Sequence, residues 1–167
     1  TTTGAGATAG PSFRTAGSVF DLAGDAGLLV PGYADLVRVS VEDDGTTARV
    51  VVETAGPLPA RLPATEVAGL GVDLYVGDRA DGDFQLFVDG SAEGWFAYLY
   101  AEGQLVRYPG TFALGGSTLR FELPWSAIGG AAVSRFSAFY DWSQDGIPDN
   151  RVGEDHAPLQ GSAPLRR

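Results

Sequence analysis

The sequence predicts an all-β protein, an antiparallel sandwich or jelly roll of eight or nine strands. Hydrophobic residues alternate with polar ones in many short segments, which is the period of a half-buried strand. Turn compositions rich in Gly, Asp and Pro separate these segments at spacings of roughly 8 to 12 residues, as in sandwiches and jelly rolls. Helical patterns are nearly absent. Only residues 124–128 have the composition of a helical turn, and Gly129 and Gly130 end it.

The alternation is clearest in residues 35–42, where three valines alternate with polar residues. The turn at residues 43–46 (DDGT) and the return segment 48–52 complete a predicted hairpin. Prolines at positions 57, 59 and 63 then indicate an irregular connection. Further strands are predicted at 18–20, 72–76, 84–88, 95–100, 104–108, 118–123 and 135–140.

A length of 167 residues suits one compact domain. We expect a flexible Thr/Ala/Gly-rich tail or linker over residues 1–12, a single sandwich over 13–160 and a C-terminal tail over 161–167. The chain has no methionine, not even at position 1, so we expect a processed or excised segment. Export is the better expectation, and the predicted location is extracellular.

The composition excludes several function classes. Eleven basic residues against 21 acidic ones give a net charge of -10, which argues against nucleic-acid partners and against docking on anionic lipid. No apolar run approaches the roughly 20 residues of a membrane helix. There is no cysteine, and the single His156 excludes a two-histidine zinc or haem site within one chain. The acidic balance suits a cation-binding or secreted protein.

Residues 141–149 (DWSQDGIPD) have the spacing of a calcium-binding loop. Side-chain oxygens recur at alternate positions, glycine permits the sharp turn, and the following backbone carbonyl points inward. The predicted ligands are Asp141, Ser143, Asp145, the carbonyl of Ile147, and Asp149. Val152 stands where an EF-hand has its glutamate, so Glu154 or Asp155 would replace that ligand. The alternative is an acidic surface turn without metal.

A second acidic group is formed by Asp21 and Asp25. Because the two chain ends of a jelly roll commonly lie close together, this group could meet Asp155. The alternative, which we favour, is a turn in which the carboxylates bond backbone N–H groups.

Aromatic residues are candidates for carbohydrate binding, because sugar rings pack their C–H faces on aromatic rings and leave hydroxyls for polar side chains. On the strand at 95–100, Phe96, Tyr98 and Tyr100 share one face, and Trp95 lies on the other. Trp142 in the acidic loop and Trp125 after a proline are expected to be more accessible. The predicted sugar-binding residues are Trp95, Trp142 and Tyr98. The alternative for each tryptophan is ordinary core filling.

Catalytic patterns are weak. The sequence contains neither a nucleophile elbow nor a complete dinucleotide fingerprint, and nothing pairs His156 with a nucleophile. Glu93, Glu102 and Glu122 lie on or near predicted strands, and glycoside hydrolysis would need two such carboxylates facing each other. The chain is therefore expected not to be an enzyme.

The order of FDLAGD, ADLVRVSVEDDG, FELPWSAIGG, FSAFYDW and DHAP resembles the DOMON-like superfamily, which includes the family 9 carbohydrate-binding modules of secreted bacterial proteins. The resemblance spans roughly residues 18–158. It implies a β-sandwich, often with structural calcium, appended to extracellular enzymes or surface proteins. Haem-binding members use methionine and histidine ligands, and this chain has no methionine. The sugar-binding role of a tryptophan pair would fall on Trp95 and Trp142.

These observations favour a non-catalytic, extracellular, calcium-stabilised β-sandwich that binds carbohydrate as an accessory module. The alternative is a structural or protein-interaction domain of a surface layer, a fibre or a multidomain secreted enzyme. In that case the tryptophans would fill the core, and edge strands would pair with another chain. The partner is accordingly a carbohydrate or another protein domain. The sequence does not fix the glycan or the oligomeric state.

Overall fold

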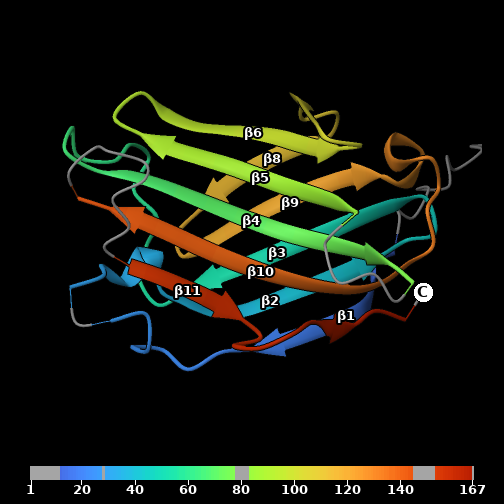
Figure 1. The fold of residues 1–167 in the computed structure, drawn as a ribbon, viewed down its shortest axis with the longest axis horizontal. Coiled ribbons are helices and arrows are strands. Elements are labelled where there is room, and N and C mark those ends of the chain that lie inside the picture. Colours follow the sequence, from blue (N-terminus) through green and yellow to red (C-terminus); the bar gives the residue numbers. More distant parts are fainter. Residues whose placement is uncertain (1–11, 28, 78–82, 145–152, 167) are drawn as a thin grey trace, which may run out of the picture.

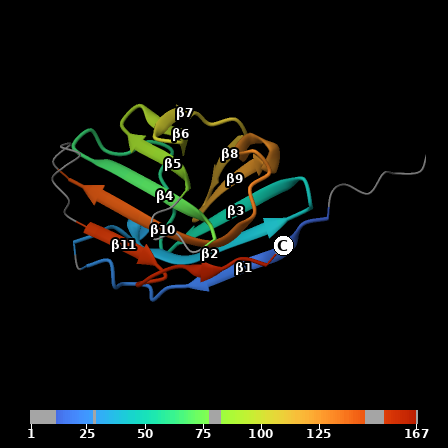
Figure 2. The same ribbon diagram turned by 45° about the vertical axis from the view of Figure 1, so that its right-hand side comes forward.

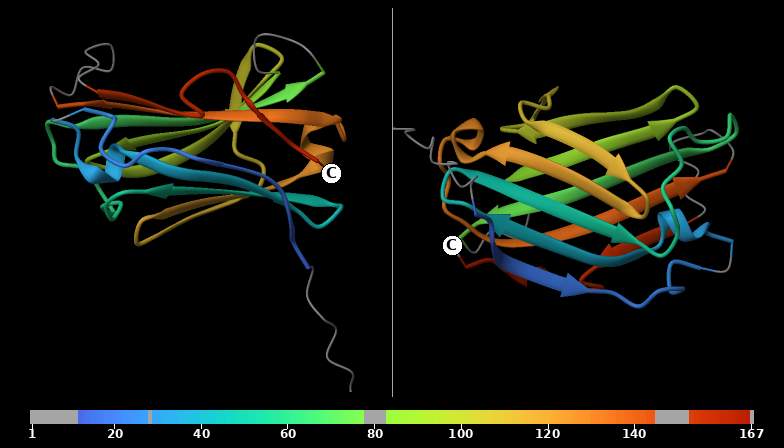
Figure 3. Two further views of the ribbon diagram at one scale, coloured as in Figure 1. Left: turned by 90° about the horizontal axis from the view of Figure 1, so that it is seen from below. Right: turned by 180° about the vertical axis from the view of Figure 1, so that it is seen from behind.

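Two antiparallel sheets packed face to face form the protein, which confirms the predicted β-sandwich (Figures 1 and 3). The structure is a computed structural model that describes residues 12–27, 29–77, 83–144 and 153–166. Two short 3-10 turns, η1 (Gly32–Ala34) and η2 (Trp125–Ile128), are the helical elements of this described part. The described residues contain no helix that is long and apolar enough to cross a membrane.

Sheet A has five strands in the order β1-β2-β3-β9-β8. Their bounds are β1 Arg14–Phe20, β2 Leu36–Asp43, β3 Thr47–Thr54, β8 Thr111–Gly115 and β9 Thr118–Pro124. Sheet B follows the order β11-β10-β4-β5-β6-β7, and the short β12 pairs with β10 beyond this path. Its strands are β4 Val67–Val76, β5 Phe84–Ser91, β6 Gly94–Ala101, β7 Gln104–Arg107, β10 Val133–Ser143, β11 Gly153–Ala157 and β12 Ala163–Pro164.

The hairpin of β2 and β3 forms where the alternation of valines predicted it. Val39 and Val41 of β2 pair with Val52 and Val50 of β3, and all four side chains are buried. The carboxylate of Asp44 accepts hydrogen bonds from the backbone N–H groups of the two threonines that follow the turn glycine, each at 2.8 Å. A period of two therefore turns one face of sheet A toward the core.

The core lies between the two sheets and is lined by alternate residues of each strand. Its largest fully buried side chains are Tyr140, Phe121, Phe136, Leu36, Leu70, Leu74, Leu86, Leu119, Leu123, Val39, Val41 and Val50. The same alternation points the intervening residues of each strand outward, so each sheet also has one outer face.

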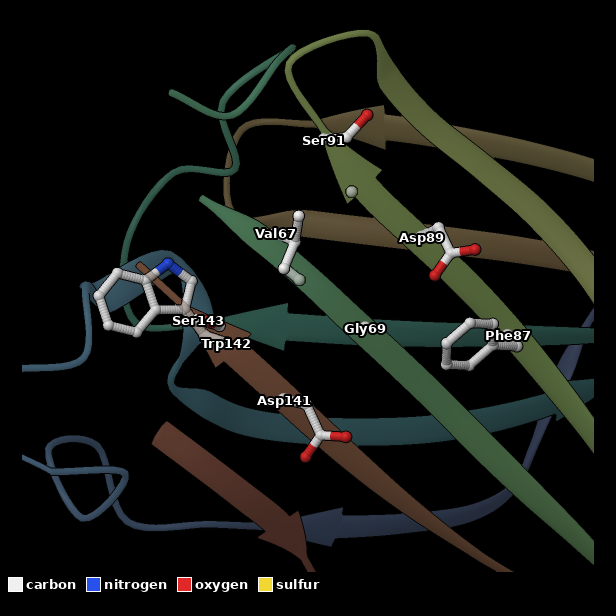
Figure 4. A pocket seen from close by; sticks show the side chains of 10 residues that line it. Val67, Gly69, Phe87, Asp89, Ser91, Asp141, Trp142 and Ser143 are labelled. Atoms are coloured by element: carbon white, nitrogen blue, oxygen red, sulfur yellow. The ribbon is translucent and has the colours of Figure 1, made fainter. Parts of the chain in front are cut away.

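Strand β10 is longer than the sequence predicts. The pattern suggests a strand ending at residue 140 and an acidic loop from 141, whereas β10 continues in register with β4 as far as Ser143. The uninterrupted alternation keeps Tyr140 and Trp142 on the core side, with exposed fractions of 1% and 4%. Asp141 consequently points to the outer face (Figure 4).

Several strands escape sequence prediction. These strands are β8, β11, β12 and the first half of β4. β11 and the first half of β4 carry Gly, Asp, Glu or His where a strand pattern would need β-branched or aromatic residues, and β12 is only an Ala-Pro pair. The C-terminal tail expected from residue 161 also packs onto the sandwich, because β12 pairs with β10 and Leu165 is buried. The N–H of Arg166 bonds the carbonyl of Ala16 at 2.8 Å, so the C-terminal segment runs beside β1 (Figure 2).

Candidate functional site

The outer face of sheet B carries a row of aromatic side chains. The strand register places a chain of directly opposed residues across the sheet, one from each strand. In order from β11 to β7, this aromatic row consists of His156, Phe139, Gly71, Phe87, Tyr98 and Arg107. Directly opposed side chains lie on the same face of a sheet, so the rings line one continuous strip.

Glycines in the central strand β4 create the space that these rings occupy. A Cβ atom on Gly71 would lie 2.2 Å from Cε1 of Phe139, and one on Gly69 would lie 3.2 Å from Cζ of Phe87. The rings of Phe87 and Phe139 therefore approach from either side, with centroids 6.4 Å apart and planes tilted by 32°. The result is an apolar floor, since no side chain rises from the middle of β4 between them.

A pocket of about 330 Å³ opens beside this floor (Figure 4). Gly69 forms its base, and Asp89 of β5 and Asp141 of β10 rise on either side because both are paired with Gly69 in the register. Ser91 and Ser143 lie further along the same two strands. The Oγ of Ser143 is buried and has no hydrogen-bond partner among the described residues. The pocket thus combines a ring of Phe87 with carboxylate and hydroxyl groups.

Two aspartates of this outer face have pKa values above their usual range. Burial raises the pKa of Asp89 above its usual range. Burial also raises the pKa of Asp73, and the bond that its Oδ1 accepts from Nε2 of Gln85 at 2.9 Å opposes this shift. Each carboxylate offers lone pairs to a donor such as a sugar hydroxyl.

The tryptophans do not supply the sugar platform that the sequence suggests. Trp142 is 4% exposed, and its indole Nε1 donates to Oε2 of Glu66 at 3.0 Å. Trp125 is equally buried, so the expectation of two accessible indoles is wrong. Trp95 lies on the inner side of β6 and donates to the carbonyl of Pro59 at 2.8 Å. Of the three predicted sugar-binding residues, Tyr98 is the one whose side chain lies on the outer face, together with Phe96 and Tyr100 as expected.

The predicted calcium loop is split by the fold. Asp141 and Ser143 belong to β10 and lie on the outer face of sheet B, where they line the pocket. Asp155 pairs with the core-facing Tyr140, so its carboxylate lies on the opposite side of the sheet. The structure therefore does not bring these three together. Asp145, Ile147 and Asp149 lie outside the described residues.

Asp155 instead meets the first acidic group of the chain. One carboxylate oxygen from each of Asp21, Asp25 and Asp155 lies within 4.8 Å of the others. Asp155 is 4% exposed, and its Oδ2 accepts the N–H of Leu36 at 2.5 Å. Burial, together with the charges of Asp21 and Asp25, raises the pKa of Asp155 to about 6. The proximity of the two chain ends is thus as the jelly-roll argument anticipated, and Asp21 also caps the N–H of Leu22 at 3.0 Å, as the alternative expected.

The glutamates considered for glycoside hydrolysis lie far apart in the fold. Glu122 is on β9 of sheet A and pairs with Arg49 at 2.9 Å. Glu93 and Glu102 are in the turns at the two ends of β6. None of the three lines the pocket on sheet B.

Sequence reasoning missed Phe87, Phe139 and Asp89, which form the floor and one wall of the candidate site. The signal that could have found them is the alternation of inward and outward positions along each strand. In the segments 67–71, 87–91 and 139–143, outward positions alternate with core residues, whereas the predicted strands cover only 72–76, 84–88 and 135–140. The pairing of the three strands, which needs the tertiary fold, is what brings these positions together.

Comparison with known proteins adds no relative: no protein family matches the chain, and no curated protein is similar enough to be matched.

Proposed function

We propose that this chain is a non-catalytic, extracellular β-sandwich module that binds carbohydrate on the outer face of sheet B. The observation that carries the proposal is the pocket in which the ring of Phe87 lies beside two carboxylates, Asp89 and Asp141, on a glycine floor. An exposed ring edge or face packs against sugar C–H groups, and carboxylates accept hydrogen bonds from sugar hydroxyls. The resemblance to carbohydrate-binding modules supports the same function.

The extent of the face favours a chain of sugars over a single ring. Beyond the pocket, the aromatic row continues across β5 and β6 to Tyr98, and the half-exposed Phe96 and Tyr100 flank it. The open floor offers few enclosed contacts, and ordering a flexible oligosaccharide costs free energy, so we expect dissociation constants in the micromolar to millimolar range.

The test is isothermal titration calorimetry with soluble hexasaccharides of glucose, xylose and N-acetylglucosamine, carried to millimolar concentrations. We expect heat of binding for at least one, weakened at least tenfold in Phe87→Ala and in Asp89→Asn. Phe87→Ala removes the apolar floor, and Asp89→Asn removes a charged acceptor without changing the volume. Glu93→Gln removes one charge from an exposed turn outside the pocket and should bind as the wild type does.

Three results would contradict the proposal. If none of the hexasaccharides gives a heat of binding, the protein does not bind carbohydrate. Equal affinity in all four proteins would place the sugar elsewhere. Release of new reducing ends during incubation, lost in Asp89→Asn, would show an enzyme instead of a binding module.

The edge of sheet B supports a second candidate function, an interaction domain. All four residues of β7 are exposed, and Leu105 and Val106 expose 54% and 43% of their surface. β7 pairs with β6 on one side, and its other backbone edge has no strand beside it in the described part of the chain. Such an edge can add a strand from another chain.

Sedimentation velocity over a concentration series separates the two candidates. An interaction domain would self-associate, and Val106→Lys would abolish the association, because a lysine on an edge strand opposes pairing. A carbohydrate module would stay monomeric over the series and keep its affinity for sugar in Val106→Lys.

A further inference from the structure

We propose that Asp21, Asp25 and Asp155, with Asp35 beside them, form a calcium site that joins the end of β1 to β11 on the core side of sheet B. The site is distinct from the pocket and from the acidic loop at 141–149, and it does not depend on the proposed function. It brings together residues from the beginning and the end of the sandwich.

The spacing of the carboxylates fits one ion. Oxygens bound to calcium lie about 2.3 to 2.6 Å from it, so two ligands of one ion can be no more than roughly 5 Å apart. The nearest oxygens of Asp21, Asp25 and Asp155 all lie within 4.8 Å of one another. Every donor is oxygen, which selects a hard cation, and calcium accepts irregular sets of carboxylates more readily than magnesium does.

Two carboxylate oxygens at this cluster are buried without a hydrogen-bond partner among the described residues. Asp35 is 6% exposed, and its Oδ2 accepts the N–H of Gly24 at 2.7 Å, which fixes the carboxylate against the turn between Asp21 and Asp25. Its Oδ1 is buried and has no hydrogen-bond partner among the described residues. The same holds for Oδ2 of Asp21. A buried anionic oxygen without a donor is costly, and a cation bound at the cluster would offset the negative charge of both carboxylates.

Backbone hydrogen bonds hold the proposed ligands in place. Asp155 accepts the N–H groups of Leu36 and His156, at 2.5 and 2.8 Å. Asp21 is fixed by its own backbone N–H, which bonds the carbonyl of Val37 at 3.0 Å. The carboxylates therefore come from β11 of sheet B and from the segment that joins β1 to β2 of sheet A. An ion at this point would clamp the two sheets together at one edge of the sandwich.

The test combines calorimetric calcium titration with thermal unfolding of the EDTA-treated full chain. We expect one calcium per chain, with a dissociation constant of about 10⁻⁴ to 10⁻³ M, as for extracellular calcium modules, and a Tm that rises with calcium concentration. Asp25→Asn changes an exposed residue, so it should fold. It should weaken calcium binding at least tenfold and, because it removes repulsion from a metal-free cluster, raise the Tm in EDTA. A misfolded variant would not combine a higher Tm in EDTA with weaker calcium binding.

Asp141→Asn is the matched control, since it removes one carboxylate from the first position of the loop at 141–149. It should leave calcium affinity unchanged. The proposal is overturned if the wild type shows no calcium binding at 10 mM, roughly tenfold above the expected range. It is equally overturned if Asp25→Asn binds calcium normally, or if Asp141→Asn removes the binding, which would place the ion in the loop.

Discussion

The carboxylates on the two outer faces of the sandwich have different neighbours. On sheet A, carboxylates face arginines: Arg49 lies 3.4 Å from Glu42 and 2.9 Å from Glu122, and Arg38 lies 3.3 Å from Glu53. On sheet B, aspartates stand among aromatic rings and glycines, and burial raises the pKa of both Asp73 and Asp89.

This difference supports our proposal that sheet B is the ligand-binding face. Charges that neutralise one another across neighbouring strands are satisfied within the protein, and a ligand would have to displace them. Carboxylates beside an apolar floor retain acceptor capacity that a ligand can use. The charges of sheet A are therefore paired within the protein, whereas sheet B is the face that we propose for recognition.

The largest expected effect separates the core from both faces. Trp142→Ala should lower the free energy of unfolding by about 3 to 5 kcal/mol, because it empties a buried site and leaves Glu66 without the indole donor. Urea unfolding measures this loss. Phe87→Ala, on the half-buried outer face, should cost clearly less. If Trp142→Ala leaves stability unchanged, the inward orientation of this indole is incorrect.

The next effect concerns the glycine floor. Gly71→Ala should destabilise the protein by about 1 to 3 kcal/mol, since the new Cβ would overlap the ring of Phe139 and force it to move. Gly115→Ala on β8 is the matched control, because nothing lies within 4 Å of its Cβ position. Urea unfolding of both variants gives the comparison. Equal stabilities would mean that Phe139 does not lie across β4.

A smaller effect is expected on sheet A. Arg49→Ala breaks two ion pairs that are about one-quarter to one-third exposed, and it should cost about 1 kcal/mol at low salt and less at high salt. Chemical unfolding at two ionic strengths measures it. Sugar affinity should not change, and a weaker affinity would indicate that sheet A contributes to binding.

The smallest effect is a difference in pH dependence. The pKa of Asp73 is raised by burial, so its ionised form disfavours folding. That penalty is present above the folded pKa and is relieved as pH falls toward 3.8. The pKa of Asp44 is lowered by hydrogen bonds from the threonines of its turn, so it contributes stability above 3.8 that is lost as pH falls through its folded pKa.

Substitution should separate these two contributions in pH-dependent urea unfolding. Asp73→Asn should flatten the stability profile above pH 3.8, and Asp44→Asn should flatten it below pH 3.8. Identical profiles for the two variants would contradict the opposite pKa shifts of Asp73 and Asp44.

Much of the fold follows from local patterns, whereas the site depends on strand order. Valines alternating along 37–41 and the Asp44 turn specify the β2–β3 hairpin without help from the rest of the chain. Strand β11 could not be predicted, because the GEDHA segment becomes a strand through its pairing with β10. Trp142 was misplaced for a related reason: an Asp-Trp-Ser segment looks like a loop until β4 extends alongside it.

The candidate site illustrates the same limit. Phe87, Gly69 and Asp141 are 18 to 72 residues apart in sequence, and none belongs to a recognisable motif. Their meeting depends on the order β10-β4-β5, which local alternation does not encode. The acidic cluster was foreseen in part, because the end of β1 and the DHAP segment were expected to lie close. Asp35 was not expected there, because the sequence pattern places it at the start of the strand over 35–42.

Sugar recognition by the outer face of sheet B is tested most directly by amide chemical-shift mapping of the isotope-labelled protein with the tightest-binding hexasaccharide. The account predicts that perturbed amides gather in 67–71, 87–91 and 139–143, and that those of 49–53 and 118–122 on sheet A stay unchanged. Perturbations concentrated on sheet A, or no hexasaccharide that perturbs any amide at millimolar concentration, would contradict it.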